Sequence, residues 1–357
     1  MSPLIILTII AILYLKSKPK FRRYIQRDNH YLSHNWTAFV NALFISLVVC
    51  SHGLLLFQTS ILDYKHEQFA AFAIFQFRQL MVTTFFFFSG YGIMYSLLHR
   101  EGYVHKLLYP RFTQLSLNYL IAVIVYFGVH CILEQKIELL YLLHGTHSYS
   151  TLGNPTWFIL ITLFIYILTF CCFRITGQGK PMIAIGLLTA ILIGSIFLII
   201  RIKPAHWVNT MLCFPAGMFY CMKGDSIESL INKTRLPSIA WAILMMYIGH
   251  QLYHLNVQYL VSIYTQNAGG ILFALGTTWL FGSFTWERSS GILTWIGGSS
   301  LFTIYMFHLL PMRILTRLDI NTGNPYLVWF YVFAATCILV PTMNLLFKKA
   351  NSLLIKK

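Results

Sequence analysis

Charged side chains are scarce in this sequence of 357 residues, of which they make up only 10%. Soluble domains carry about 25% charged residues, so the composition excludes a water-soluble globular protein. Acidic residues are the rarest, and 26 Lys and Arg against 10 Asp and Glu give a formal charge of +16. Such a charge can indicate nucleic-acid binding. The chain lacks a basic soluble module of the kind that such proteins use, so we expect no nucleic-acid partner.

The seven cysteines lack the spacing of a disulfide framework or a metal site, and most lie in apolar runs. There a cysteine behaves as a small hydrophobic residue. The first segment, MSPLIILTIIAILYLKSKPK, has no basic region before its apolar run and no small-residue cleavage site after it. Those are the features of a cleaved leader, so we interpret 3–15 as a retained first helix.

Long apolar segments are abundant: 57% of the residues are hydrophobic, and the mean hydropathy is +0.66. Segments of membrane-spanning length recur along the chain and predict an all-α fold, a polytopic bundle of transmembrane helices. We expect about eleven spans, the first of them shorter than the roughly 17 residues that a full crossing needs. The candidate spans are 3–15, 36–58, 81–98, 112–133, 156–173, 182–200, 206–222, 237–253, 268–284, 291–309 and 326–346.

These spans divide the chain into an N-terminal helix with a basic segment (1–35), a transmembrane domain (36–346) and a basic tail (347–357). Cytosolic loops are enriched in Lys and Arg. If the basic segment 16–27 lies in the cytosol, the tail lies there too. Two short loops, which contain Arg201 and Arg313, are exceptions, because this orientation puts their positive charges on the outer side. We expect a multi-pass protein of the plasma or inner membrane, in contact with membrane lipids, with a cytosolic C-terminus.

The run SLVVCSHGLLLF places one imidazole, His52, inside an apolar span. A charge in hydrocarbon is costly, so His52 is expected to face the bundle interior or a wet cavity. Asn41 lies eleven residues earlier, almost three helical turns, so Asn41, Val48 and His52 share one stripe of about 16 Å. The stripe suggests a polar passage. The alternative is a neutral histidine that is hydrogen-bonded to a neighbouring helix.

Other candidate groups lie near span ends. Arg78 precedes the span at 81, Asn154 and Trp157 flank the start of the span at 156, and Tyr305 and His308 share one helical face. A basic cluster follows the span 81–98. It either anchors a cytosolic loop or binds the phosphates of a polyanionic molecule. The cluster consists of Arg100, Lys106 and Arg111.

Two further patterns are weaker. WVNTMLCFPAGM contains Pro215 and Gly217, which suggest a kink in the span 206–222, lined by Trp207 and Asn209. His250 and His254 have the i, i+4 spacing of metal ligands, but without a third ligand we expect no metal site.

The ordered set of motifs resembles the acyltransferase-3 family of integral membrane acyltransferases, in its short form without an appended extracellular domain. The resemblance runs from about Trp36 to Leu346, over a core of about ten helices to which the first helix is an addition. In the family the essential histidine follows a basic residue by eleven positions, and here that position is Asn41. The motifs are NALFISLVVCSH, FFFFSGYGIMYS, KLLYPRFTQL, GNPTWFI, CFPAGM and SSLFTIYMFH.

The resemblance implies O-acyl transfer, usually of acetyl, from cytosolic acetyl-CoA as co-substrate to a hydroxyl of a cell-surface carbohydrate, without a metal. His52 would act as base or transient acyl carrier, with His308 as a second catalytic candidate. The acceptor would contact Arg78, Tyr305, Trp157 and Asn154, and the CoA donor would contact Asn41, Arg100, Lys106 and Arg111. A transporter or flippase of a glycan intermediate is the alternative, which the lack of an evident inverted repeat disfavours.

Overall fold

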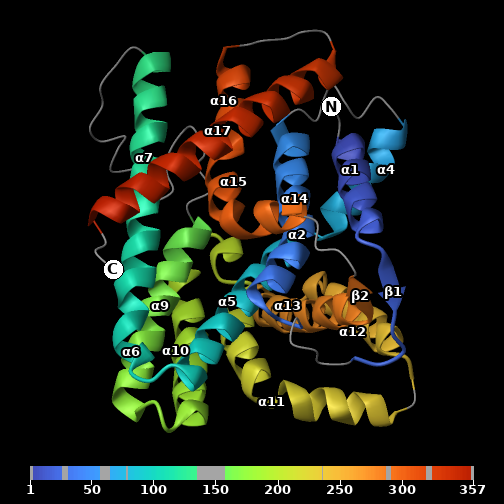
Figure 1. Cartoon of the computed structure of the whole chain (residues 1–357), viewed down its shortest axis with the longest axis vertical. Helices are drawn as coiled ribbons and strands as arrows, with labels where there is room; N and C mark the ends of the chain where they lie inside the picture. Colours follow the sequence, from blue (N-terminus) through green and yellow to red (C-terminus); the bar gives the residue numbers. More distant parts are fainter. Residues whose placement is uncertain are drawn as a thin grey trace.

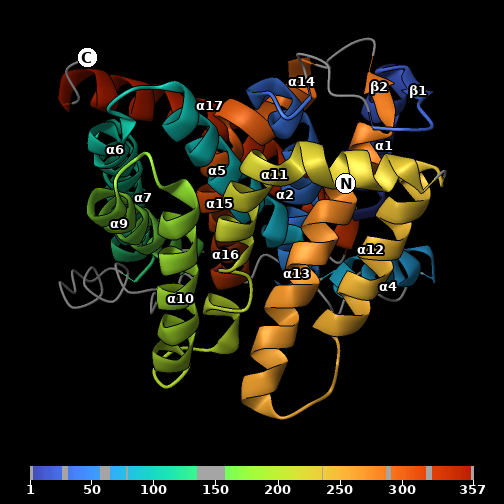
Figure 2. The same cartoon turned by 90° about the horizontal axis from the view of Figure 1, so that it is seen from below.

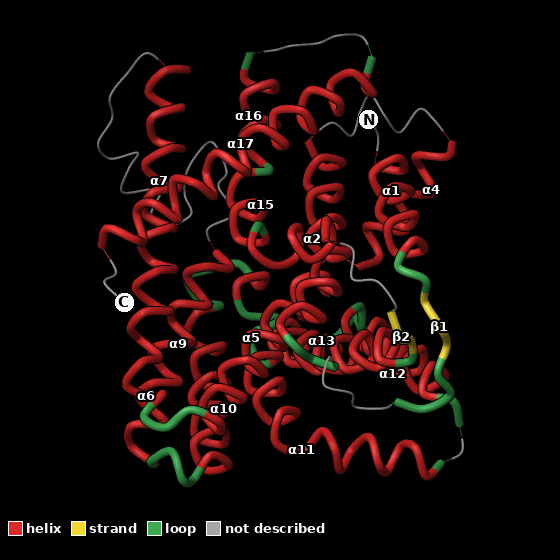
Figure 3. Tube along the Cα trace, in the orientation of Figure 1, coloured by secondary structure: helices red, strands yellow, loops and turns green. Residues whose placement is uncertain are grey.

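A computed structural model describes residues 3–25, 31–56, 65–77, 79–134, 157–234, 236–286, 291–318 and 324–354. Within these residues the fold is the expected all-α bundle (Figures 1 and 3). The long helices are α1 (Pro3–Lys16), α2 (His34–Leu56), α4 (Lys65–Phe77), α5 (Leu80–His99), α7 (Thr113–Glu134), α9 (Trp157–Thr176), α10 (Pro181–Ile199), α11 (Cys213–Lys233), α12 (Ser238–Tyr253), α13 (Tyr259–Gly282) and α17 (Pro325–Leu354).

Short helical elements complete the bundle. They are α6 (Tyr103–Lys106), the π-helical turn η1 (Leu107–Phe112), the single turn η2 (Ala205–Trp207), α14 (Gly291–Thr294), the π-helical turn η3 (Trp295–Ser299), α15 (Leu301–Phe307) and α16 (Leu309–Arg317). Strands β1 (Pro19–Phe21) and β2 (Phe284–Trp286) pair antiparallel, with Lys20 opposite Thr285. This small sheet ties the segment after α1 to the end of α13.

Among the described residues, six helices are long and apolar enough to cross a membrane, or seven if the bent pair Gly291–Ser299 and Leu301–Arg317 counts as one. Each predicted span overlaps a helix, so the multi-pass architecture is confirmed, while the number of eleven crossings stays a prediction. The helices α1 and α12 have 14 and 16 residues, which is short for a full crossing.

The structure departs from the expected spans in three places. The segment 206–222 is not one helix: α11 begins at Cys213 and continues to Lys233. Pro215 therefore lies in the first turn, where its ring causes no clash, and does not kink the span. Helix α4 was not predicted; its Ile74 side chain is buried, whereas Phe69 is 74% exposed. Helix α17 continues to Leu354, past the boundary expected at 346.

Two glycines bring helix backbones into contact. A Cβ on Gly90 would lie 1.9 Å from the carbonyl oxygen of Phe214, and a Cβ on Gly217 would lie 1.9 Å from that of Phe87. Helices α5 and α11 therefore cross at the distance that small residues permit. Gly92, in the same FFFFSGYG motif, has no such neighbour within 4 Å.

A third close approach positions the C-terminal part of the site. A Cβ on Gly297, in η3, would lie 1.9 Å from the carbonyl oxygen of Ala38 in α2. The Tyr126 hydroxyl on α7 donates a hydrogen bond of 2.7 Å to the carbonyl oxygen of Met306. The first contact holds η3, the turn before α15, against α2, and the second ties α15 to α7. Figure 2 shows α12 and α13 side by side, as a separate pair that meets through Gly249 and Gly269.

Candidate active site

Two histidines that lie 256 positions apart in the sequence meet in the bundle. His52 Nδ1 lies 2.6 Å from His308 Nε2, and the two rings are nearly parallel, with 7° between their planes. His52 belongs to α2, and His308 lies at the junction of α15 and α16, where it is fully buried. The contacts of η3 and α15 with α2 bring these two segments together.

A hydrogen bond from His308 to the backbone indicates which ring nitrogens of this pair carry protons. His308 Nδ1 lies 2.9 Å from the carbonyl oxygen of Ile304, which only accepts hydrogen bonds, so Nδ1 carries the proton. His308 Nε2 then has a lone pair and accepts the hydrogen bond that His52 Nδ1–H donates. His52 Nε2 is left with its own lone pair. This tautomer of His52 is the one that can remove a proton or attack a carbonyl through Nε2.

His52 lines a cavity of about 810 Å³, the His52 cavity. Its walls combine aromatic rings with amide side chains. Trp157 and His206 meet edge to face with ring centroids 5.6 Å apart. Asn209 donates hydrogen bonds to the Tyr253 hydroxyl at 2.9 Å and to Gln266 Oε1 at 3.1 Å. Burial lowers the pKa of His206, in the loop before α11, so its ring is neutral at neutral pH.

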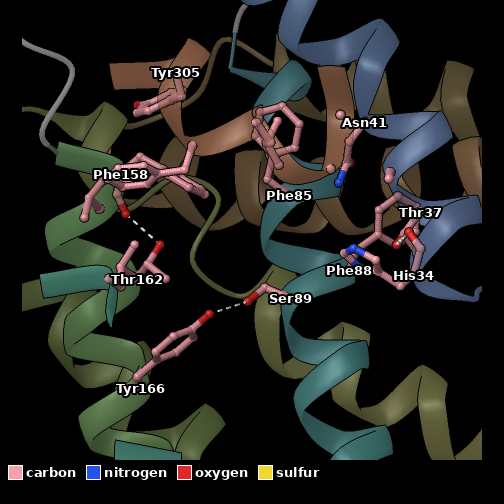
Figure 4. Close-up of a pocket in the computed structure, with 17 residues that line it drawn as sticks. His34, Thr37, Asn41, Phe85, Phe88, Ser89, Phe158, Thr162, Tyr166 and Tyr305 are labelled. Carbon is pink, nitrogen blue, oxygen red and sulfur yellow. Dashed lines mark hydrogen bonds between the residues drawn. The ribbon is translucent and has the colours of Figure 1, made fainter. Parts of the chain in front are cut away.

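A second cavity, the Asn41 cavity, encloses about 280 Å³ around the first half of α2 (Figure 4). Its lining includes Asn41, Ser89 and Tyr166, and the Ser89 and Tyr166 hydroxyls lie 3.0 Å apart. Asn41 Oδ1 is buried without a hydrogen-bond partner among the described residues. The described part of the chain contributes no Lys or Arg to this lining.

The predicted stripe is therefore divided between two cavities. Asn41 lines the smaller one, while Val48 and His52 line the larger. Tyr305 lines both, and Trp157 lines the His52 cavity. Arg78 and Asn154 lie outside the described residues, although their neighbours Gln79 and Trp157 line the His52 cavity.

The predicted basic cluster lies at the end of α5, in α6 and in η1. None of its three members lines either cavity, and the guanidinium of Arg111 lies 5.7 Å from the centre of the Tyr103 ring. A contact between Arg100, Lys106 or Arg111 and a CoA molecule stays a prediction. The His250 and His254 rings lie 4.4 Å apart, and His254 Nε2 donates a hydrogen bond to the carbonyl oxygen of Gln76.

Sequence reasoning missed several polar residues of the site. Gln266 and Tyr253 lie inside apolar segments, and only their isolated polarity marked them. Arg313 stood out only as a departure from the charge bias of the loops. In the structure Arg313 lies on α16, the helix that begins next to His308. Arg313 Nε is buried without a hydrogen-bond partner in the part of the chain that the structure describes.

Comparison with known families adds an independent finding. Residues 37–345 match the profile of the family described as Acyltransferase domain, Acyl_transf_3. The matched region contains both histidines, the described lining of the His52 cavity, and that of the Asn41 cavity except His34. No curated protein and no solved structure matches the chain.

Proposed function

Because this chain belongs to the acyltransferase-3 family and is a multi-pass membrane acyltransferase, we propose that it moves an acetyl group from acetyl-CoA to a hydroxyl of a cell-surface carbohydrate. The observation that carries the proposal is the His52–His308 pair at the wall of a polar cavity. The pair supplies a neutral imidazole with a free Nε2, which acyl transfer to an alcohol needs.

In a direct route, both substrates are bound at once. His52 Nε2 removes the proton of the acceptor hydroxyl while its oxygen attacks the thioester carbonyl carbon. The tetrahedral intermediate collapses, the carbon–sulfur bond breaks, and the proton on Nε2 passes to the departing CoA sulfur. The products are the acetyl ester and CoA thiol, and His52 regains its starting tautomer.

In a two-step route, His52 carries the acetyl group. Nε2 attacks the thioester and releases CoA, and the proton on His52 Nδ1 passes to His308 Nε2 along their 2.6 Å hydrogen bond. The acceptor hydroxyl then attacks the acetyl carbonyl, the bond between the acetyl carbon and Nε2 breaks, and His308 returns the proton to Nδ1. The hydroxyl proton passes to water, and the CoA that left as a thiolate in the first step takes up a proton from water. Both routes use the same tautomer of His52.

The two cavities suit the two substrates. Aromatic rings and amide groups, as found around Trp157 and Asn209, are suited to stacking on a sugar and hydrogen-bonding its hydroxyls, so we assign the acceptor to the His52 cavity. The donor then enters through the Asn41 cavity, at the N-terminal end of α2. The positive-inside rule places that end in the cytosol of a plasma or inner membrane, where acetyl-CoA is available.

The test combines membranes that contain the protein with acetyl-CoA and an extract of envelope glycans. We expect CoA thiol to be released and the glycan to gain the mass of one acetyl group per modified unit. His52→Ala should abolish both signals, since a base typically contributes about 10²–10⁴-fold. The matched control is His99→Ala, because His99 is an exposed histidine whose hydrogen bond, within the described part of the chain, goes to Tyr95 on its own helix. Equal product from His52→Ala and the wild type would refute the role of His52, and a transporter would release no CoA.

A further inference from the structure

Tyr305 is shared by the linings of the two cavities. Among the described residues it alone lines both the Asn41 cavity and the His52 cavity. Both cavities draw on α2, α5, α9 and α15, so they approach each other from opposite ends of the same group of helices. Figure 4 shows the Tyr305 ring beside Phe158, across the smaller cavity from Asn41.

The position of Tyr305 is tightly held. Its side chain is 3% exposed, and its ring centroid lies 5.2 Å from that of Phe158 and 6.3 Å from that of His308. The backbone next to it is fixed by the hydrogen bond from Tyr126 to Met306. A ring held in this way is a rigid wall, because densely packed interiors yield little to added volume.

Tyr305 also lines the same cavity as His52. Tyr305 and His308 are three residues apart on one helical face, and His308 bonds directly to His52. A donor that enters through the Asn41 cavity must bring its thioester carbonyl to within about 3–3.5 Å of His52 Nε2. Its acyl group then lies against the Tyr305 ring.

We propose that Tyr305 is the partition between the donor and acceptor cavities, and that its ring limits the length of the acyl group that reaches His52. This inference rests on the proposed function. It makes Tyr305 a specificity-determining residue through the size of its ring.

The experiment measures transfer from acetyl-, propionyl-, butyryl- and hexanoyl-CoA to the same glycan extract. One methylene in an apolar pocket changes discrimination by about 10–200-fold. We therefore expect the wild type to prefer acetyl over butyryl by at least about tenfold. Tyr305→Leu and Tyr305→Ala should reduce that preference by at least about tenfold. Tyr305→Phe keeps the ring and should keep the ratio of acetyl to butyryl transfer.

The matched control is Tyr331→Leu, because Tyr331 is an exposed tyrosine on α17 that lines neither cavity. The ratio of acetyl to butyryl transfer in this variant should equal that of the wild type. An unchanged ratio in Tyr305→Leu and Tyr305→Ala overturns the partition. Loss of all transfer in the Phe, Leu and Ala variants, with the protein still inserted, also overturns it, because Tyr305 would then act on the chemistry through its hydroxyl. Failure of the proposed function looks different, since the wild type would then transfer no acyl group from any of the four donors.

Discussion

Replacing His308 tests whether this residue sets the tautomer of His52. His308→Leu removes the acceptor of the 2.6 Å hydrogen bond and, with it, the hydrogen bond that His308 Nδ1–H donates to the Ile304 carbonyl oxygen. His52 Nδ1–H is then buried without a partner, at a cost of about 1–3 kcal/mol. The ring can regain a partner only by rotating or by moving its proton to Nε2, which removes the lone pair from the reacting nitrogen.

The expected loss follows from that change. A wrong tautomer of a catalytic histidine costs about 10⁴-fold in serine proteases. A general base is worth about 10²–10⁴-fold. We therefore expect kcat to fall by about 10²–10⁴-fold in His308→Leu, with KM for acetyl-CoA nearly unchanged. In His308→Gln, the amide oxygen takes the place of Nε2 as acceptor, and activity should stay at least about tenfold above that of His308→Leu.

The assay is CoA release in membranes that contain equal amounts of inserted protein. Thermal unfolding of both variants in the same detergent separates a loss of folding from a loss of chemistry. Activity of His308→Leu within about threefold of the wild type would refute the tautomer argument, because that is far below the contribution of a base. Equal activities of the Gln and Leu variants would refute it as well, because only glutamine can accept the hydrogen bond.

Two further predictions concern stability. Gly90→Ala places a Cβ 1.9 Å from the backbone of Phe214 and should lower the free energy of unfolding by about 1–3 kcal/mol. Gly92→Ala, two residues away in open space, should be neutral or stabilising by up to about 1 kcal/mol. Thermal unfolding in detergent measures both, and equal effects would contradict the close crossing of α5 and α11. Because burial lowers the pKa of His206 below 6.5, the unfolded chain binds its proton first as pH falls. The contribution of the neutral His206 ring to the free energy of unfolding is therefore complete above pH 6.5, and it is lost as pH falls through the lower pKa of the folded state. We expect the free energy of unfolding of His206→Gln to fall less than that of the wild type between neutral and acidic pH. If the free energies of unfolding of the wild type and His206→Gln change equally with pH across that range, the expected direction of the effect is wrong.

Much of the helical architecture could be predicted from the sequence, because a protein that lies in lipid must meet strict limits on helix length and polarity. Hydrocarbon demands long apolar helices, so hydropathy located nearly every helix, and the cost of a buried imidazole singled out His52. The contact between His52 and His308 depends on how α15 approaches α2. A backbone contact at Gly297 governs that approach, and no periodicity records it. Helix α4 was not predicted because it has only 13 residues, fewer than a span needs, and its first four residues, 65–68, are polar.

The division into two cavities was equally hidden. A stripe of Asn41, Val48 and His52 along one helix predicts a continuous passage, because the stripe carries no information about side chains from other helices. Tyr305 comes from a segment more than 250 positions later in the chain, as the separation of His52 and His308 illustrates. Its place in the packing decides where the stripe is interrupted.

The pairing of β1 with β2 has a consequence for the order of events at the ribosome. Lys20 and Thr285 are 265 positions apart, and the Thr285 hydroxyl donates a hydrogen bond to the Lys20 carbonyl oxygen. At about 5–20 residues per second, the N-terminal segment waits some tens of seconds before its partner strand emerges. Helix α1 can contact α2 much earlier, through the hydrogen bond that the Tyr14 hydroxyl donates to the Phe39 carbonyl oxygen. A nascent chain arrested before β2 would therefore have a packed α1 but an unpaired β1 edge.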